Sequence, residues 1–385
     1  MPPQAVRPER TAHRKPVEPM KRPCIAWMST KFPLELAQTF ELEVYCPESF
    51  AAASARKGQS TALLQRAADL GYPADLCSYS RIGLAAAAAG GADGLPRPDL
   101  LLCCDNICSN MVQWYSQMAR MLNVPLLLLD FPYRDTPEVG ESQLSYLKGQ
   151  VRALINQLAQ LTGRPWDEAR FAAACRNANA SSRAWQAVLD VARLDPPPLT
   201  NLELTDFMPL LVTGRCRPDT AQKLRAAAET LRRRPAMPEP KPQRVFFEGT
   251  PCWPAFEVLC RALDEHGLLV TADTLTPSLG FAYQDLDGML RAYCRTVNGS
   301  PLEEGVESRC GLCRRYGAEG VLVHYNRSCR PWCGTLPEVE RRLSAELGVP
   351  VAAFSADQAD PAEWNPAQLA TRLDALSEQM ERRTL

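Results

Sequence analysis

The sequence lacks both a long apolar segment and an excess of charge of one sign. Its longest soft run, residues 84–92, falls well short of the roughly 18 apolar residues that a membrane helix needs. The 43 basic and 44 acidic side chains give a net charge of −1. This balance produces no overall electrostatic field that would attract nucleic acid or an anionic lipid surface. We therefore expect neither nucleic acid nor a membrane as a partner.

Several familiar catalytic motifs are also missing. Gly249 and Gly334 are not part of a GxGxxG sequence, and no phosphate-binding Walker sequence is present. We therefore expect that the chain does not hydrolyse ATP itself. No arrangement of Ser, His and Asp or of paired carboxylates stands out. The sequence has only 3 histidines, and neither His13 nor His266 indicates a ligand site.

The N-terminal segment has no apolar stretch of the kind that a secretory signal contains. Residues 1–21 are instead rich in Pro and Arg, which predicts a disordered basic leader. Without a signal for export, we expect the protein to be cytoplasmic.

Cysteine is abundant for a chain expected in a reducing compartment. The sequence has 15 cysteines, together with 46% hydrophobic and 23% charged residues, the ordinary balance of a globular protein. Reducing conditions keep thiols free, so cysteines that gather in the fold indicate metal or redox chemistry. A free cysteine is also a small apolar residue. We therefore expect most of the fifteen to be core residues.

Eight short apolar runs alternate with segments of helical periodicity. Such runs are typical of strands buried on both faces of a parallel sheet. Their alternation with helices predicts right-handed βαβ units. The predicted fold class is α/β, with two doubly wound, Rossmann-like parallel-sheet domains and a helical insert between them. The runs are residues 24–29, 42–47, 99–105, 124–132, 244–250, 268–273, 320–326 and 349–357.

The helical insert lies between the fourth and fifth runs. Residues 143–161 and 166–194 have helical periodicity, and the prolines at 196–198 end that pattern. A Pro-rich stretch at 232–243 marks a boundary. We predict an N-terminal α/β domain at 22–138, an insert with its linker at 139–242, and a C-terminal α/β domain at 243–385.

The two α/β domains weakly repeat each other. In residues 98–132, Asn106 and Cys108 follow an apolar run, and in residues 318–357, Asn326 and Cys329 do the same. In both segments a helical stretch comes next, and then a Val-Pro step, preceded by Asn or Gly, leads into another run. This ordered set of matches indicates duplication of one doubly wound unit.

Cys108 and Cys329 therefore follow strands at the start of a helix. In doubly wound sheets, ligands bind outside the carboxyl ends of the strands. The N–H groups and the positive dipole end of a helix N-terminus favour thiolate, which is the metal-binding form. Cys77 lies in a turn after the helical segment 60–75 and could face the same crevice. Three thiolates from two domains would then meet at one point.

Two kinds of metal centre use three such cysteines. A tetrahedral zinc site is one, although it usually draws on closely spaced cysteine pairs, which are missing around Cys77. A [4Fe–4S] cube is the other, and it fits three dispersed cysteines better. Three thiolates bind three irons and leave the fourth open to accept a substrate oxygen.

Several segments carry a resemblance to a known family, and they include DLCSYSR around Cys77, DNIC ending at Cys108 and NRSCRPW around Cys329. In this order they resemble the family of 2-hydroxyacyl-CoA dehydratase component D, which includes ATP-dependent benzoyl-CoA reductase. The resemblance spans nearly the whole chain after the leader. The segments are residues 31–48, 75–84, 98–133, 246–259 and 320–332.

The resemblance implies that Cys77, Cys108 and Cys329 are the iron ligands of a [4Fe–4S] cluster. It implies two partners: a homologous second dehydratase subunit with its own cluster, and an ATP-dependent iron–sulfur activator protein that delivers one electron. The acyl-CoA substrate would become a ketyl radical at its thioester carbonyl, lose hydroxide from the α-carbon and a proton from the β-carbon, and return the electron. The product would be an enoyl-CoA. In the benzoyl-CoA branch, electrons reduce the aromatic ring instead.

Three alternatives remain within this interpretation. The chain could be a subunit of an aryl-CoA reductase, or a partner subunit whose cluster only relays electrons. The relay predicts a fourth thiol, Cys104 or Cys333, beside the other three, and no pocket for a pantetheine arm. A related subgroup holds a double-cubane cluster with extra cysteines, but no cysteine-rich segment lies between Cys77 and Cys103. Cys103 and Cys104 lie in an apolar run and fit a core position better.

A few other side chains are candidates for a role. Glu248 and His324, near strand carboxyl ends, are possible proton acceptors, although a packed histidine and a helix-capping glutamate explain them as well. Cys310 and Cys313 form a CxxC sequence without the strand-to-helix turn of redox motifs, which favours two half-buried helix cysteines. Candidates for hydrogen bonds that tune the cluster are Asn106, Ser78 and Ser328.

Overall fold

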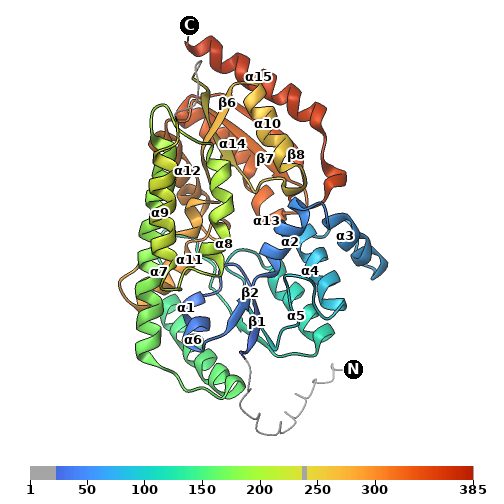
Figure 1. Cartoon of the computed structure of the whole chain (residues 1–385), viewed down its shortest axis with the longest axis vertical. Coiled ribbons are helices and arrows are strands. Elements are labelled where there is room, and N and C mark those ends of the chain that lie inside the picture. Colours follow the sequence, from blue (N-terminus) through green and yellow to red (C-terminus); the bar gives the residue numbers. More distant parts are fainter. Residues whose placement is uncertain (1–22, 236–240, 385) are drawn as a thin grey trace, which may run out of the picture.

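The computed structural model describes residues 23–235 and 241–384. It contains two four-stranded parallel sheets with flanking helices, one in the lower and one in the upper half of Figure 1. The predicted fold class is therefore confirmed. We call each sheet with the helices packed on it a lobe. The predicted leader lies outside the described residues, and so does part of the Pro-rich stretch.

All eight predicted strands are present. The first sheet has the order β2-β1-β3-β4 and the second has the order β6-β5-β7-β8. Each sheet thus arranges its own four strands in the same way, as expected for a duplicated unit. The strands are β1 (Ile25–Met28), β2 (Glu43–Tyr45), β3 (Leu100–Cys104), β4 (Leu126–Leu129), β5 (Gln243–Glu248), β6 (Leu268–Asp273), β7 (Gly320–Asn326) and β8 (Val351–Ala356).

Helices connect the strands and cover both faces of the sheets (Figure 1). Before β5 these are α1 (Leu34–Thr39), α2 (Pro47–Arg56), α3 (Ser60–Asp69), α4 (Ser78–Ala88), α5 (Asn110–Leu122), α6 (Glu141–Thr162), α7 (Glu168–Leu189), α8 (Met208–Val212) and α9 (Thr220–Arg232). After β5 these are α10 (Phe256–Glu265), α11 (Leu286–Cys294), α12 (Leu302–Tyr316), α13 (Arg330–Cys333), α14 (Leu336–Leu347) and α15 (Pro366–Thr384).

Both faces of each sheet are buried. Successive side chains of a strand face opposite sides, so neighbouring residues enter different cores. Cys104 packs in the core on one face of the first sheet and Cys103 in the core on the other. In the second sheet, Phe246 likewise packs in the core on one face and Phe247 in the core on the other. This two-sided burial explains why the strands read as continuous apolar runs.

The two lobes exchange helices where they meet. Ala51 and Ala55 of α2 and Ile82 of α4 follow strands of the first sheet but pack in a core of the second. In the opposite direction, Tyr293 of α11 packs in a core of the first sheet. The helices α2, α4 and α11 are therefore held by residues from both halves of the chain.

Helix α7 belongs to both lobes. Phe171 and Ala178, in its first half, pack in a core of the first sheet, and Trp185 and Val188, in its second half, pack in a core of the second. It lies beside α9 along one side of the molecule (Figure 1).

The predicted repeat includes matching helix ends. Asn123 ends α5 with a φ of 52°, and Gly348 ends α14 with a φ of 63°. Both residues take the left-handed conformation that Gly, and less often Asn, adopts where a helix ends. The Val-Pro step then leads directly into the fourth strand of each sheet.

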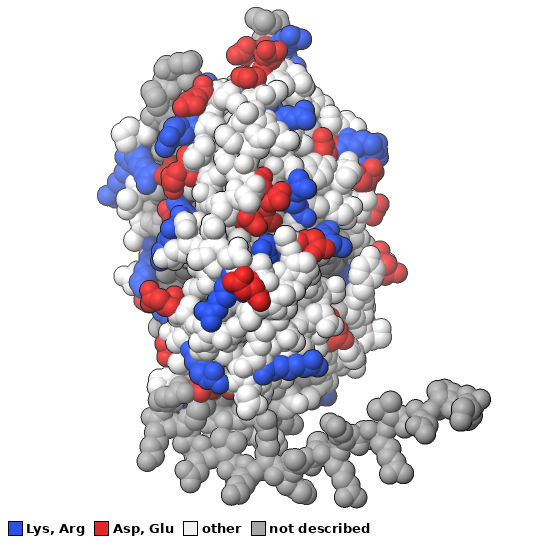
Figure 2. All heavy atoms as spheres, turned by 90° about the vertical axis from the view of Figure 1, so that its right-hand side faces the viewer, with Lys and Arg blue, Asp and Glu red and all other residues white. Residues whose placement is uncertain are grey.

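The distribution of charge on the surface and the limited apolar length of the helices agree with the balanced composition. Figure 2 shows basic and acidic side chains interspersed over one face. Among the described residues, no helix has both the length and the apolar character needed to cross a membrane.

Candidate functional site

Two of the predicted cluster cysteines follow equivalent strands. Cys108 lies in the loop between β3 and α5, and Cys329 is the N-cap of α13, just after β7. These strands occupy the same position in the two sheets. The predicted strand–loop–helix setting of both cysteines is therefore confirmed, and both lie at the edge where α/β sheets bind ligands.

Cys77 reaches this edge from the start of α4, of which it is the N-cap. The helix expected over residues 60–75 is shorter than predicted, because α3 ends at Asp69 and Gly71 follows with a φ of 88°. A turn then leads into α4.

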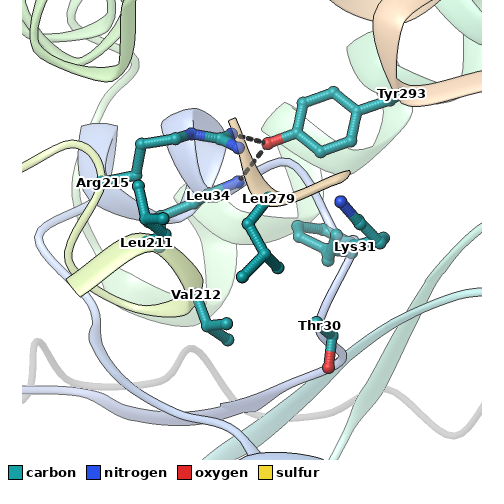
Figure 3. Close-up of a pocket in the computed structure, with 9 residues that line it drawn as sticks. Thr30, Lys31, Leu34, Leu211, Val212, Arg215, Leu279 and Tyr293 are labelled. Atoms are coloured by element: carbon teal, nitrogen blue, oxygen red, sulfur yellow. Dashed lines mark hydrogen bonds between the residues drawn. The ribbon is translucent and has the colours of Figure 1, made fainter. Parts of the chain in front are cut away.

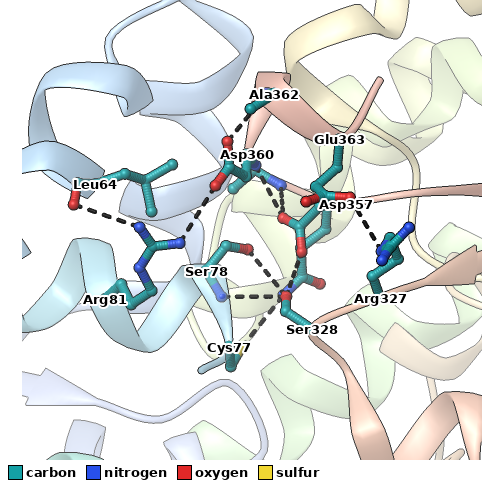
Figure 4. A network of polar contacts seen from close by, with 12 residues as sticks. Leu64, Cys77, Ser78, Arg81, Arg327, Ser328, Asp357, Asp360, Ala362 and Glu363 are labelled. Atoms are coloured by element: carbon teal, nitrogen blue, oxygen red, sulfur yellow. Dashed lines mark hydrogen bonds and ion pairs between the residues drawn. The ribbon is translucent and has the colours of Figure 1, made fainter. Parts of the chain in front are cut away.

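The turn that carries Cys77 contacts the loop that carries Cys329. The N–H of Ser78 donates to Oγ of Ser328 at 3.2 Å, and Ser328 donates in turn to the carboxylate of Asp357 (Figure 4). Nε2 of Gln358 donates to Sγ of Cys77 at 3.5 Å. Residues 357 and 358 follow β8, so this strand also helps to position the cysteine.

The three cysteines lie close enough for the charge of one to act on another. Burial is the largest influence and raises the pKa of all three thiols, that of Cys77 to about 12. A charge on Cys108 would raise the pKa of Cys77 further, and charges on Cys77 and Cys108 would raise that of Cys329. The contact of Ser78 with Ser328 joins the segments of Cys77 and Cys329, and the influence of Cys108 on both thiols indicates that its loop lies nearby.

Backbone N–H groups interact with all three sulfurs and lower the pKa of each thiol, which opposes the rise in pKa that burial causes. They come from the loop or the helix turn that immediately follows each cysteine. Hydrogen bonds of this kind stabilise a thiolate and also tune the sulfur ligands of a cluster. The donors are Tyr79 and Ser80 for Cys77, Asn110 and Met111 for Cys108, and Trp332 for Cys329.

The exposure of the cysteines separates these three from most of the others. All fifteen lie in the described part of the chain, and none forms a disulfide there. Cys77, Cys108 and Cys329 are partly exposed, and the other cysteines in this class are Cys175, Cys260 and Cys333. Nine others are buried, as expected for core cysteines. They include Cys310 and Cys313 on α12, which are fully buried and not half-buried as predicted, because both face the core of the second lobe.

This donor set is chemically suited to a cluster, in which each cysteine binds its own iron. Within residues 23–235 and 241–384, no three His, Cys, Asp or Glu side chains are arranged to hold one metal ion. Thiolates on one zinc lie about 2.3 Å from the metal, so their sulfurs are within about 4.6 Å of one another. In a cube each thiolate binds a different iron, and the sulfurs lie farther apart. Three partly exposed thiols with N–H donors could therefore serve as ligands to three different irons.

Cys333 and Cys104 differ in their relation to the three cysteines. Cys333 lies near Cys329, and a charge on Cys333 would raise the pKa of the Cys329 thiol. The Sγ of Cys333, however, donates to the carbonyl of Asn326 at 2.9 Å. Cys104 is fully buried, and its Sγ lies 3.2 Å from Oγ of Ser29.

Glu248 is held in a buried ion pair. Nε and Nη2 of Arg309 donate to its two oxygens at 2.8 and 2.9 Å, and Nε1 of Trp332 donates at 2.7 Å. The hydroxyl of Thr274 also donates to this carboxylate. With its side chain fully buried, Glu248 presents the features of a structural anchor between β5, the loop after β6, α12 and α13.

His324 is packed in the interior of the second lobe. Its ring is fully buried, stacks on Phe354 at a centroid distance of 4.8 Å, and interacts through Nδ1 with the carbonyl of Thr250. Burial lowers its pKa, which favours the neutral ring.

Asn106 also makes structural bonds. Its amide donates to the carbonyls of Lys31 and Tyr293, at 3.3 and 2.8 Å, and its oxygen accepts from Sγ of Cys104. These contacts fix the loop that leads to Cys108.

A buried carboxyl group that sequence reasoning missed lies near Cys108. Glu48, at the start of α2, is 9% exposed, and its Oε1 has no hydrogen-bond partner within the described chain. Burial raises its pKa, and its charge in turn raises the pKa of Cys108. Its Oε2 accepts from Sγ of Cys46 and from the hydroxyl of Tyr115, each at 3.1 Å. No motif signals this residue, because its burial depends on helices from distant parts of the chain.

The fold and this site define a class of protein: a two-lobed α/β protein in which a cysteine of each lobe follows the carboxyl end of an equivalent parallel strand. Comparison with known proteins identifies the family. The model of the family "2-hydroxyglutaryl-CoA dehydratase, D-component" matches residues 29–380, and the chain belongs to this family. The resemblance inferred from the sequence is confirmed.

The relatives include several dehydratase subunits. The alpha subunit of (R)-2-hydroxyglutaryl-CoA dehydratase from Acidaminococcus fermentans is 34% identical over 93% of this chain and 92% of its own length. The alpha subunit of (R)-phenyllactyl-CoA dehydratase from Clostridium sporogenes is 32% identical over 92% and 89%. A benzoyl-CoA reductase subunit from Thauera aromatica is 22% identical over 91% and 87%.

Proposed function

We propose that this chain is the alpha-type subunit of a 2-hydroxyacyl-CoA dehydratase, a hydro-lyase that removes water from a CoA thioester. The observation that supports the proposal is the contact between the segments of Cys77 and Cys329, with the loop of Cys108 near enough to influence both thiols. These three cysteines would hold a [4Fe–4S] cluster. Such a cluster supplies the one-electron chemistry that acid–base side chains lack. The dehydratase names of several relatives at 32–34% identity favour dehydration over ring reduction.

The side chains of this protein would supply proton transfer and orientation. A general base needs a lone pair that its substrate can reach. Oε1 of Glu48 is buried in the free chain but has no hydrogen-bond partner among the described residues, its pKa is raised, and its charge acts on Cys108. We therefore assign it as the acceptor of the substrate's β-proton, which requires that bound substrate displaces the side chains that cover this oxygen. The oxygens of Glu248 are already occupied by Arg309, Trp332 and Thr274.

The proposal includes two protein partners and a location. A homologous second subunit would complete the enzyme, and a separate ATP-dependent iron–sulfur activator would supply the electron, since this chain has no Walker sequence of its own. An oxygen-sensitive centre with free thiols would be kept intact in a reducing cytoplasm.

Iron and sulfide analysis of the anaerobically purified protein tests the cluster. We expect about four irons per chain, and loss of that iron in Cys77→Ala, Cys108→Ala and Cys329→Ala. Cys175→Ala is the matched control, because Cys175 is a partly exposed cysteine on α7 outside the site. Full iron content in all three ligand variants would refute the assignment.

One further variant separates this proposal from the electron-relay alternative. Cys333 is the partly exposed thiol next to Cys329 that could act as a fourth ligand. We expect Cys333→Ala to keep its iron and its dehydratase activity. Loss of iron in this variant would favour a closed, four-cysteine cluster and the relay function.

A further inference from the structure

The two carboxyl oxygens of Glu48 have different surroundings. Oε2 accepts from the hydroxyl of Tyr115, on α5, and from Sγ of Cys46, the N-cap of α2, each at 3.1 Å. Oε1 has no hydrogen-bond partner within the described chain. A carboxylate oxygen accepts about two hydrogen bonds, so these two donors satisfy Oε2. The pair of donors therefore determines which oxygen of Glu48 remains free to accept a proton.

Tyr115 is the stronger and the more firmly held of the two donors. A phenol hydroxyl is a full hydrogen-bond donor, whereas a thiol is a weak one. The side chain of Tyr115 is completely buried, and its ring packs edge-on against Trp114 at a centroid distance of 5.3 Å. The position of the Glu48 carboxylate, which belongs to α2, is therefore set from α5.

Helix α5 also follows one of the proposed cluster ligands. Cys108 lies two residues before α5, and Tyr115 lies five residues after the start of this helix, which is about 7.5 Å along its axis. Trp114, beside Tyr115, packs so tightly on α4 that a Cβ atom at Gly83 would lie 2.6 Å from its ring. Helix α4 begins just after Cys77. The donor to Glu48 is therefore fixed within the two packed helices that follow two of the proposed ligands.

We propose that Tyr115 is a positioning residue for the dehydration, because its hydroxyl holds Oε2 of Glu48 and leaves Oε1 to accept the β-proton. The inference rests on the proposed dehydratase function with Glu48 as its base. In the step that it supports, the β-C–H bond breaks, the proton joins Oε1, and the electron pair of that bond stays on the substrate. Tyr115 neither gains nor loses a proton, and its contribution is the orientation of the base.

The same hydrogen bond affects the ionisation of Glu48. Burial raises the pKa of this carboxyl, and the bonds from Cys46 and Tyr115 lower it, because both donors stabilise the charged form. Burial also raises the pKa of both donors, so they remain protonated while Glu48 ionises. The ionisable side chains that interact electrostatically with Glu48 include Cys46, Cys103, Cys104, Cys108 and Tyr115. Loss of the Tyr115 hydroxyl should therefore move the pKa of Glu48 further upward.

Infrared titration of the complete enzyme tests the hydrogen bond without any substrate. The C=O stretch of protonated carboxyl groups is followed with pH, and the Glu48 band is the one that is missing in Glu48→Gln. Because hydrogen bonds to charged groups are strong, Tyr115→Phe should raise the midpoint of this band by about one pH unit or more. The iron content should stay at the wild-type value. An unchanged midpoint would overturn the proposal.

Turnover by the activated enzyme tests the orientation of the base. The probes are the CoA thioesters in the names of the relatives: (R)-2-hydroxyglutaryl-CoA, (R)-phenyllactyl-CoA, (R)-2-hydroxyisocaproyl-CoA and lactoyl-CoA. With the fastest of them, at a pH above the acid limb, Tyr115→Phe should lower kcat about ten-fold and leave KM within about two-fold, because the base is misplaced while substrate binding is intact. A wild-type kcat, or a loss confined to KM, would show that the hydroxyl has no positioning role.

Tyr283→Phe is the matched control. The hydroxyl of Tyr283 donates to another buried carboxylate, Glu35, at 2.6 Å, and Glu35 keeps Tyr293 at 2.7 Å and Arg215 at 2.8 Å as partners. Figure 3 shows the hydroxyl of Tyr293 hydrogen-bonded to Arg215 beside a small cavity. Tyr283→Phe should leave the Glu48 midpoint and kcat unchanged. Shifts of the same size in the two variants would contradict a specific role of Tyr115.

The outcomes separate this inference from the function on which it rests. Wild-type turnover together with an unshifted Glu48 midpoint in Tyr115→Phe would refute the positioning role and leave the dehydratase function intact. A wild-type enzyme with full iron content that converts none of the four thioesters would refute the dehydratase function, and the positioning role with it.

Discussion

The N–H of Ser78 donates to Oγ of Ser328 at 3.2 Å, across 250 residues of sequence. Each residue is a direct neighbour of a proposed cluster ligand, Cys77 on one side and Cys329 on the other. Ser328 also contacts Oγ of Ser78 at 3.4 Å and the carboxylate of Asp357 (Figure 4). One hydroxyl thus joins the two lobes beside the site.

Removal of this hydroxyl should loosen the site without unfolding the protein. In Ser328→Ala we expect a cluster that is lost several times faster on exposure to a chelator, because outer hydrogen bonds hold metal ligands in place. The iron released over time under anaerobic conditions measures this. Ser344→Ala, which removes an exposed hydroxyl on α14, is the control. Identical release rates in the two variants would show that the bridge has no role in holding the cluster.

Glu48→Gln should abolish dehydration while leaving the cluster in place. The amide preserves the shape of the side chain but cannot accept a proton, and a lost general base costs about 10²–10⁴-fold in rate. The measurement is kcat at saturating substrate, with iron content as the parallel readout. Glu43→Gln, on the edge strand β2, should retain activity. A fully active Glu48→Gln enzyme would remove Glu48 from the reaction.

The pH dependence of activity should also reveal Glu48 as the base. Burial raises the pKa of Glu48, and the base must be ionised to act, so activity should fall on the acid side at a pH above the ordinary carboxyl range of about 4. The pH dependence of kcat/KM measures this limb. An acid limb at an unperturbed carboxyl pKa would argue against a buried base.

Lys31 should make the stability of the protein depend on alkaline pH. Its pKa is about 7 in the folded state and 10.5 for the unperturbed side chain. Between these values the unfolded chain binds more protons, so the free energy of unfolding should rise as pH increases from about 7 towards 10.5. Urea unfolding at several pH values measures the slope. This slope should be smaller in Lys31→Met than in the wild type, and an unchanged slope would contradict the burial of a neutral lysine.

The buried Arg309–Glu248 ion pair should contribute to the free energy of unfolding. Arg309→Met leaves the fully buried Glu248 without its cation, and breaking a buried pair in this way costs about 3–5 kcal/mol of unfolding free energy. Chemical denaturation measures the loss. Arg341→Met removes an exposed ion pair with Glu338 and should cost less than about 1 kcal/mol. Equal stabilities of these two variants would show that Glu248 is not a structural anchor.

The sequence was sufficient to predict the strands and the setting of the cysteines. Two-sided burial leaves a continuous apolar run, and Cys108 and Cys329 follow such runs directly. The length of α3 was not predictable from periodicity alone, because the helix ends where Gly71 adopts a positive φ. Glu48 and Lys31 could not be recognised for a different reason: each is a single charged residue whose burial comes from elements far away in the chain.

The position of α7 constrains how the two lobes can move. Its 22 residues are anchored in the cores of both lobes, so the lobes cannot separate unless Trp185 or Phe171 leaves its packing. Any rearrangement that keeps both cores intact is therefore confined to the loops that join strands and helices.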